Sequence, residues 1–227
     1  TKIPLSDFGE TLDPPSVDVT AHLLEMYGRL GYTREDAEVA RGFEYVISEQ
    51  EEDGSWFGRW GVNYVYGAGA VLPALEAIGE DMSQQYVRRA VDWVVAHQNE
   101  DGGWGESCGS YVDPTLRGVG PSTASQTAWA LLGLVAAKEH ESEATQRGLA
   151  YLAETQDADG SWDEPYFTGT GFPGYGVGER LTELPDIGET SYQGLEMPAG
   201  FMINYHLYRN YWPLLALGRY FQAISGR

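Results

Sequence analysis

The chain has one cysteine, few basic residues and no long apolar run. Cys108 alone excludes an internal disulfide and fits a reducing compartment. Only 14 lysines and arginines stand against 34 acidic residues, which gives a net charge of −20. This balance excludes the basic footprint that nucleic-acid binding requires. No apolar stretch approaches the roughly 18 residues of a membrane-spanning helix. The first residues lack the pattern of a signal peptide, so we expect a protein that is not secreted.

One seven-residue pattern, Q-x-x-D-G-[SG]-W, occurs three times. The copies cover residues 50–56, 98–104 and 156–162, so they begin 48 and 58 residues apart. A repeat of this length indicates an array of supersecondary units. Asp-Gly after a helical run predicts a turn with a positive φ at the glycine, and the Gln amide can bond free backbone groups at a helix end. We predict that each copy, here called a clasp, fastens a helix end to the next unit.

Periodicity and capping signals predict seven helices and no strand, so the predicted fold class is all-α. The helices that precede a clasp carry mixed charged faces, whereas those that follow carry Gly, Ala and aromatics. Residues 105–121 and 163–200 are predicted to be irregular. Ser16 and Ser122 are the predicted N-caps of two helices, and Pro213 is a predicted kink. The predicted ranges are 17 to 28 or 30, 35–50, 62–78, 83–97, 122–137, 142–155 and 201–224.

The repeated pattern resembles the QW repeat of the triterpene cyclases. Five further stretches resemble the C-terminal third of bacterial squalene-hopene cyclases: DFGE at 7–10, DVTAH at 18–22, GRWGVNY at 58–64, SQTAWAL at 125–131 and TGTGFPG at 168–174. The resemblance covers nearly all of residues 1–227, as one C-terminal part of the cyclase domain. The exception is an inserted loop at 174–200, where 26 residues from Tyr175 to Gly200 replace a short connection. Its apolar residues could contact a membrane or a neighbour, or it could be a mobile surface loop.

The resemblance implies an α/α toroid, an incomplete α-α barrel of helical hairpins with an inner and an outer ring. The helices before the clasps fit the outer ring, and those after them fit the inner ring. A closed ring of this family needs about twelve helices, and the end units of an open array lack neighbours. The sequence also lacks an initial Met. We therefore expect a partner: the rest of a longer polypeptide, a second chain, or an identical chain in a homodimer.

The resemblance also implies a reaction, the cyclisation of a linear polyprenoid such as squalene to a polycyclic, hopene-like triterpene. A carboxylic acid protonates a terminal alkene, and carbocations move through the folded chain until proton loss or water capture. The first ending makes the enzyme an isomerase (intramolecular transferase), the second a lyase. The cascade requires a dry pocket lined with π-faces. No cofactor and no metal are expected, and the resemblance implies a monotopic enzyme at the cytoplasmic side of a membrane.

By the same resemblance, six aromatic residues match the substrate cavity of the family. They are Trp60, Tyr66, Phe172, Phe201, Tyr205 and Tyr208. Phe172, in the GTGFP sequence, matches the phenylalanine that stabilises cations. Positions 201, 205 and 208 follow i, i+4, i+7 spacing, so they share one face of the predicted last helix. The alternative interpretation of this stripe is core packing.

Asp18 and His22 are four residues apart on the first predicted helix. They can hydrogen-bond there, and a carboxylate raises the proton affinity of an imidazole. In the family the matching pair supports the catalytic acid of an upstream Asp-x-Asp-Asp motif, with the histidine protonated. That motif is absent from these 227 residues. We therefore expect that the chain alone cannot start the cascade and requires the N-terminal part of the cyclase. An ordinary surface pair is the alternative.

Two other classes of enzyme use related toroids. Prenyltransferase β subunits hold zinc with Asp, Cys and His, but Cys108 has no Asp at the required spacing, and the histidines are scattered at His97, His140 and His206. Glycoside hydrolases need a carboxylate pair across a groove. The candidates for that pair are Glu106, Asp113, Asp163 and Glu164.

A non-enzymatic alternative also stays open. With the same toroid fold, the chain could be a terpenoid-binding or scaffold module, or a fragment without activity. A folded, monomeric and inert chain would favour this alternative over the cyclase.

Overall fold

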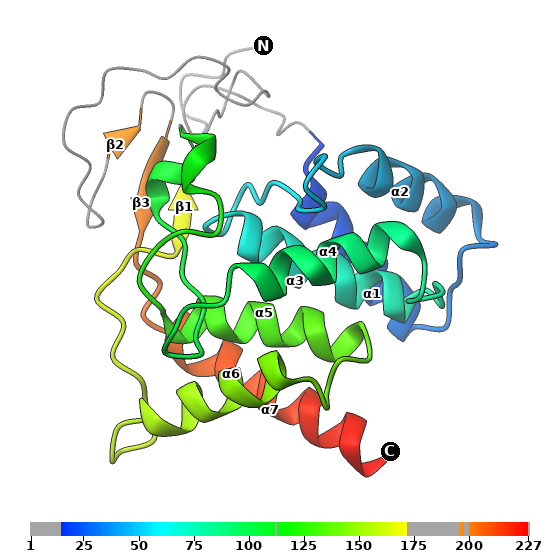
Figure 1. Ribbon diagram of the computed structural model, residues 1–227. Helices are drawn as coiled ribbons and strands as arrows, with labels where there is room; N and C mark the ends of the chain where they lie inside the picture. The colour runs from blue at the N-terminus through cyan, green and yellow to red at the C-terminus, as the bar shows by residue number, and fades with distance from the viewer. Residues whose placement is uncertain (1–14, 112, 172–195, 198–199, 227) are drawn as a thin grey trace.

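A computed structural model describes residues 15–111, 113–171, 196–197 and 200–226 (Figure 1). Within these residues the chain folds into seven α-helices and three short strands. The first six helices begin and end within a few residues of their predicted bounds. The helices are α1 (Val17–Arg29), α2 (Ala37–Ser48), α3 (Tyr64–Ala77), α4 (Gln85–Ala96), α5 (Ala124–Ala136), α6 (Glu143–Glu154) and α7 (Tyr208–Ser225).

The helices are arranged in two rows. α1, α3, α5 and α7 pack side by side in an inner row, and α2, α4 and α6 cover it as an outer row (Figure 1). All residues of α3 from Tyr64 to Leu75 and of α5 from Ala124 to Val135 are buried. α4, in contrast, buries one face only. The predicted division into inner helices rich in small residues and amphipathic outer helices is confirmed.

Glycines let the inner helices approach their neighbours closely. A Cβ at Gly69 of α3 would lie 2.6 Å from the carbonyl oxygen of Trp129 in α5. At Gly67 it would lie 2.0 Å from the carbonyl oxygen of Trp56 in the first clasp. A side chain at either position would force the backbones apart. The two glycines therefore set the position of α3, which carries part of the candidate site.

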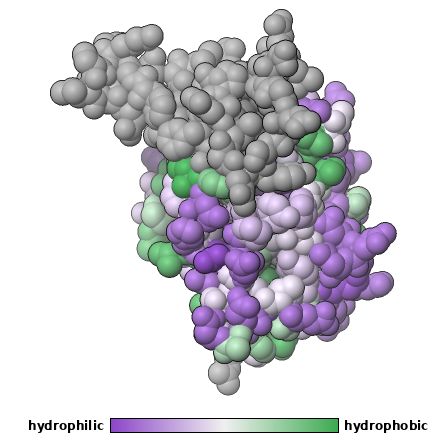
Figure 2. All heavy atoms as spheres, turned by 90° about the vertical axis from the view of Figure 1, so that its left-hand side faces the viewer, coloured by the Kyte–Doolittle hydropathy of each residue, from purple (hydrophilic) through white to green (hydrophobic). Residues whose placement is uncertain are grey.

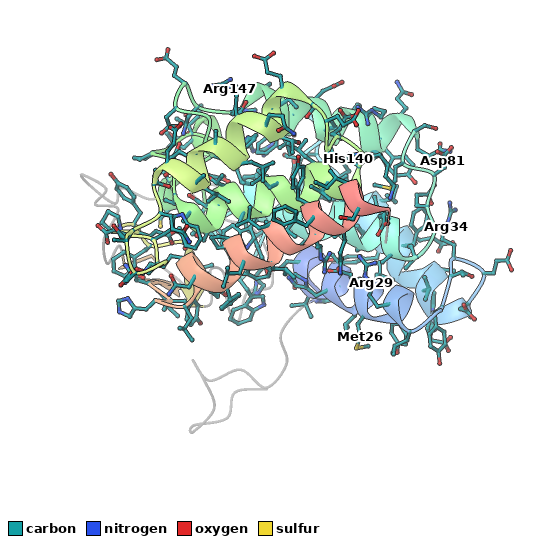
Figure 3. All side chains as sticks on the ribbon, turned by 90° about the horizontal axis from the view of Figure 1, so that it is seen from below. Met26, Arg29, Arg34, Asp81, His140 and Arg147 are labelled. Atoms are coloured by element: carbon teal, nitrogen blue, oxygen red, sulfur yellow. The ribbon has the colours of Figure 1, made fainter. Side chains whose placement is uncertain are left out.

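The two ends of the inner row meet. Arg219 of α7 forms an ion pair with Glu25 of α1, with 2.5 Å between Nη1 and Oε1. The ring of His22 stacks on Trp212, with 6.5 Å between centroids. Figure 3 shows α7 passing beside α1. The first and last inner helices therefore touch through their side chains.

Apolar side chains are exposed along one edge of α1. Val19, Leu23, Met26 and Leu30 follow helical spacing, and all are exposed. Met26 points away from the body of the protein (Figure 3). Figure 2 shows hydrophilic residues over much of the face that it draws, with small hydrophobic patches at the left edge, at the upper right below the grey atoms and at the bottom.

A small sheet replaces the first turns of the predicted last helix. β1 (Gly169–Gly171), β2 (Glu196–Met197) and β3 (Gly200–Ile203) form an antiparallel sheet in the order β1-β3-β2, with Gly171 opposite Phe201. The prediction of a helix from residue 201 was wrong, because the backbone of β3 pairs with β1 instead. α7 begins at residue 208 and continues through Pro213. Most of the inserted loop at 174–200 lies outside the described residues.

The N-cap of α5 is Thr123 and not the predicted Ser122. The Thr123 hydroxyl accepts a hydrogen bond from the Gln126 N–H at 3.2 Å. The Ser122 hydroxyl instead donates to Asp101 Oδ1 at 2.7 Å, which joins it to the second clasp. Ser16 does stand at the N-cap position of α1, but its side chain makes no capping bond there.

Candidate functional site

All three clasps share the same internal bonds. In each, the indole N–H of the tryptophan donates to the carbonyl oxygen ten residues earlier, near the end of the preceding outer helix. The pairs are Trp56–Val46 at 2.8 Å, Trp104–Val94 at 2.7 Å and Trp162–Leu152 at 2.8 Å. The clasp glycines have φ values of 97°, 87° and 87°, as predicted for the turn. The clasp tryptophans are buried parts of this framework and not parts of a binding surface.

Aromatic side chains of the inner helices form one connected cluster. Tyr66 of α3 packs on Trp129 of α5, with 4.8 Å between ring centroids. Trp129 meets Tyr208 and Trp212 of α7 edge-on, at 5.8 and 5.9 Å. Tyr66 and Trp129 are 7% and 1% exposed. Three segments that are distant in sequence therefore bring π-systems to one place between the inner helices.

The predicted cavity residues reach this cluster to different extents. Tyr66 and Tyr208 belong to it, and Tyr205 packs on Tyr208 at 4.7 Å but is 41% exposed. Phe201 lies in β3, so the predicted helical stripe of 201, 205 and 208 does not exist. Phe172 lies outside the described residues. Trp60, the remaining predicted cavity residue in the described chain, is hydrogen-bonded through its backbone to Asp18 on α1.

Asp18 and His22 make hydrogen bonds to different partners. The buried Asp18 carboxylate accepts the backbone N–H of Trp60 at 2.8 Å. Trp60 is half-buried, and its carbonyl oxygen accepts the N–H of Thr170 in β1 at 3.2 Å. His22 Nε2 lies 3.0 Å from the hydroxyl oxygen of Tyr66. The pair therefore links α1 to the segment before α3 and to the aromatic cluster.

Burial controls the protonation of this pair. It raises the pKa of Asp18 above its usual 3.8, although the bond from the Trp60 N–H opposes the rise. Burial also lowers the pKa of His22 below its usual 6.5, and the negative charge of Asp18 opposes this effect only in part. The imidazole is therefore neutral near pH 7. The protonated imidazole stays a prediction, because it concerns the cyclase with the acidic Asp-x-Asp-Asp segment, which this chain does not contain.

The sequence analysis missed three members of the site. Trp129 and Trp212 connect the cluster, and Tyr211 packs on Tyr208 at 5.6 Å and on Trp212 at 5.2 Å. The sequence did contain a signal for Tyr211 and Trp212, because they follow Tyr208 at i+3 and i+4 and so share a helix face with it. Trp129 stands in the SQTAWAL stretch at 125–131, where its inward direction could not be read without the position of α5.

Two buried glutamates hold the N-terminal ends of inner helices. Glu106 Oε2 accepts the N–H groups of Asn63 and Val65 at the start of α3, at 3.2 and 2.9 Å. Glu164 accepts the N–H and hydroxyl of Ser125 at the start of α5, at 2.8 and 3.0 Å. Each glutamate stands two residues after a clasp tryptophan. Carboxylates are favoured at helix N-termini, so these side chains have a structural role.

These roles leave the glycosidase alternative without a carboxylate pair. Burial raises the pKa of Glu106 to about 7 and also raises that of Glu164. The other candidates, Asp113 and Asp163, lie at the surface, where Asp113 bonds the N–H of Thr115. The four carboxylates thus do not face one groove.

The zinc alternative also lacks a site in the described chain. Cys108 is buried, and its thiol donates to the carbonyl oxygen of Phe167 at 3.2 Å. No three His, Cys, Asp or Glu side chains among the described residues lie close enough together to hold a metal ion. A pocket of about 250 Å³ between Arg29, Lys138 and Arg219 involves none of the predicted site residues. None of the described helices has the length and apolar character needed to cross a membrane.

The chain is similar to known cyclases over almost its whole length. The profile of the squalene-hopene cyclase C-terminal domain matches residues 1–177. The squalene-hopene cyclase of Alicyclobacillus acidocaldarius is 54% identical over 99% of this chain, and that of Zymomonas mobilis is 44% identical over 96%. The dammaradiene synthase of Dryopteris crassirhizoma is 40% identical over 96%.

The matched regions cover 32%, 30% and 31% of those three proteins. The chain thus spans about a third of the length of the curated relatives that it matches. The family predicted from the clasps and from the five matching stretches is confirmed. This chain belongs to the squalene-hopene cyclase family and corresponds to its C-terminal domain.

Proposed function

We propose that this chain forms part of the cavity of a cyclase that converts squalene, or a similar linear polyprenoid, to a polycyclic, hopene-like triterpene. The aromatic cluster of Tyr66, Trp129, Tyr208 and Trp212 carries the proposal. Its π-faces stabilise the positive charge that develops along a folding polyene, most strongly in a water-free site. Trp60, Phe172, Phe201 and Tyr205 are proposed as further contacts of the substrate.

In this proposal the chain supports the acid but does not supply it. The Asp-x-Asp-Asp motif would come from the N-terminal part of the cyclase. His22 and Tyr66 form a hydrogen-bonded pair next to the cluster, at 3.0 Å. An ionised carboxylate of that segment, placed beside His22, would raise the pKa of the imidazole and accept its hydrogen bond. Asp18 positions Trp60 through its backbone N–H.

We also propose peripheral attachment to the cytoplasmic side of a membrane. The proposed substrate is a hydrocarbon, so it must be collected from lipid. Exposed apolar side chains of α7 and of the turn before it support this proposal: Leu207, Leu214 and Phe221. Co-sedimentation with uncharged phosphatidylcholine vesicles tests it, because a chain with a net charge of −20 gains nothing from anionic lipid. Recovery of the cyclase in the supernatant at every lipid concentration would contradict it.

Cyclisation of squalene, followed by gas chromatography with mass detection, tests the proposed reaction. The chain is assayed alone and together with a chain that carries the upstream Asp-x-Asp-Asp segment. We expect a polycyclic product only from the mixture. Tyr208→Ala should reduce or redirect product formation in the mixture, whereas Tyr32→Ala, at an exposed position outside the cluster, should not. A boiled mixture is the blank.

Two outcomes would contradict parts of this proposal. Product from the chain alone would show that the acid lies within these 227 residues. No product in either assay, from folded chains that bind each other, would favour a terpenoid-binding or scaffold module instead.

A further inference from the structure

Two segments that are far apart in the sequence lie antiparallel at Gly61 and Gly169. Gly61 precedes α3, and Gly169 opens β1, which lies beside β3 (Figure 1). The Val62 N–H donates to the Thr168 carbonyl oxygen at 2.9 Å, and the bond that the Thr170 N–H makes lies on the other side of the pair. The two glycines are therefore a closely spaced pair, and side chains at both positions would share one face.

A tyrosine ring fills that face at each glycine. A Cβ at Gly61 would lie 2.6 Å from Cγ of Tyr66, and one at Gly169 would lie 2.4 Å from Cδ2 of Tyr205. Carbon atoms in favourable contact are about 3.5–4 Å apart. Neither glycine has a positive φ, so the backbone conformation does not require glycine at either position. The requirement comes from the rings, which rest directly on the backbone.

The two rings differ in their freedom to move. Tyr66 is 7% exposed and lies against Trp129, with 4.8 Å between ring centroids. Tyr205 is 41% exposed, so its ring has solvent beside it. A methyl group at Gly61 would press on an enclosed ring, and we expect it to cost stability. A methyl group at Gly169 would instead displace the ring of Tyr205.

The backbone of β1 is fixed beside this ring. The Thr168 hydroxyl donates to Glu164 Oε1 at 3.0 Å and lies 3.0 Å from the Ser125 hydroxyl at the start of α5. All three of these side chains are buried. A Cβ at Gly169 would also lie 3.1 Å from the Ile203 carbonyl oxygen of β3, a contact that a shift of a few tenths of an ångström relieves. The larger displacement therefore falls on the tyrosine.

We propose that Gly169 is a positioning residue, which sets the place of the Tyr205 ring and so selects the product of the proposed cyclisation. This inference rests on the proposed function, in which Tyr205 contacts the substrate. A methyl group at position 169 would move the ring by about 1 Å, from 2.4 Å to an ordinary carbon contact. A misplacement of about 1 Å can cost about 100-fold in rate. The displaced ring no longer stabilises its carbocation, so the cascade ends earlier.

Gly169→Ala, in the two-chain assay with squalene, tests the proposal. We expect the ratio of the parent's main polycyclic product to partly cyclised products to fall about tenfold or more. Gly218→Ala is the matched control, because it adds the same methyl group on α7 with no atom within 4 Å. It should leave the product ratio unchanged. Urea unfolding of both variants checks that the fold is kept.

A second substitution shows whether Gly169 acts through the ring. Tyr205→Ala removes the ring, so Gly169→Ala should not change the product ratio further in that background. If Gly169→Ala alone does not fold, Tyr205→Ala should restore folding, because the obstructing ring is then absent.

Fluorine NMR of the chain labelled with 3-fluorotyrosine gives a reading that needs no activity. The resonance of Tyr205 is identified by its loss in Tyr205→Phe. We expect it to move in Gly169→Ala and to stay in place in Gly218→Ala.

Three results would overturn this proposal while the parent mixture still gives product. They are an unchanged product ratio in Gly169→Ala, a Tyr205 resonance that does not move, and an effect of Gly169→Ala on folding or product that persists in the Tyr205→Ala background. No product from the parent mixture would contradict the proposed function itself, and this inference would fall with it.

Discussion

The buried carboxyl group of Glu106 is expected to make the protein less stable as pH rises. Its ordinary pKa of 4.5 is raised to about 7 in the folded chain, chiefly by burial, although the N–H groups of Val65 and Asn63 oppose the rise. The folded state thus holds this proton more tightly than the unfolded state does. Its contribution is fully present below pH 4.5 and is lost as pH rises through 7. At 1.36 kcal/mol per pKa unit, a difference of about 2.5 corresponds to about 3.4 kcal/mol.

Glu106→Gln removes this titration and keeps an oxygen that can accept the two N–H groups. Urea unfolding, followed by tryptophan fluorescence, would be measured for both proteins from pH 5 to 8. Subtracting the two free energies of unfolding cancels the other titrating groups. We expect the variant to gain about 2.5 kcal/mol relative to the parent over this range. Glu100→Gln, at an exposed position in the second clasp, is the control and should show no such trend.

A flat difference would refute this reasoning. It would mean that the two backbone N–H bonds offset the desolvation of the carboxylate, so that Glu106 titrates alike in the folded and unfolded chains. A difference of opposite sign would mean that the helix terminus dominates and stabilises the ionised form.

Three further predictions concern packing and reactivity. Trp104→Phe and Trp162→Phe should each lower the free energy of unfolding by about 1–3 kcal/mol, because a buried carbonyl loses its indole donor. Urea titrations measure this change, and no loss in either variant would show that the clasp bonds contribute little. Gly67→Ala should cost more than about 2 kcal/mol in the same measurement, since its Cβ would meet the Trp56 carbonyl, whereas Gly218→Ala, with no atom within 4 Å, should be neutral or stabilising. Burial raises the pKa of the Cys108 thiol to about 12, so a thiol-specific reagent at pH 8 should label it only at the rate of unfolding, and rapid labelling of native protein would contradict its burial.

The local parts of this structure could be predicted from the sequence. The clasps were predicted because their bonds join residues within about ten positions, as between Trp56 and Val46. The six helices that flank them were predicted because their periodicity and small residues reflect burial directly. Asp18, His22 and Tyr66 were identified from the family resemblance, and the structure brings Tyr66 to the aromatic cluster with His22 beside it.

The remainder depends on contacts between distant segments. Phe201, Tyr205 and Tyr208 have helical spacing, but pairing with β1 decides the conformation around Phe201. The roles of Glu106 and Glu164 could not be read from sequence, because the helix starts that they bond lie about 40 residues earlier. The lowering of the His22 pKa by burial could not be read from the sequence either, because desolvation depends on the neighbours that the fold brings to the ring.

The hydrogen bonds of the clasps predict the order in which the helices unfold. The first two clasps each join one outer helix to the next, because Gln50 donates to the Tyr86 carbonyl of α4 and Gln98 to the Ala144 carbonyl of α6. Unfolding cooperativity therefore passes between neighbouring outer helices. An outer helix that is bonded to a neighbour on both sides, as α4 is, unfolds less often than one bonded on a single side. Amide hydrogen exchange should therefore be slowest in α3, α4 and α5 and fastest in α2 and α6, and loss of native structure should spread inward from the two ends.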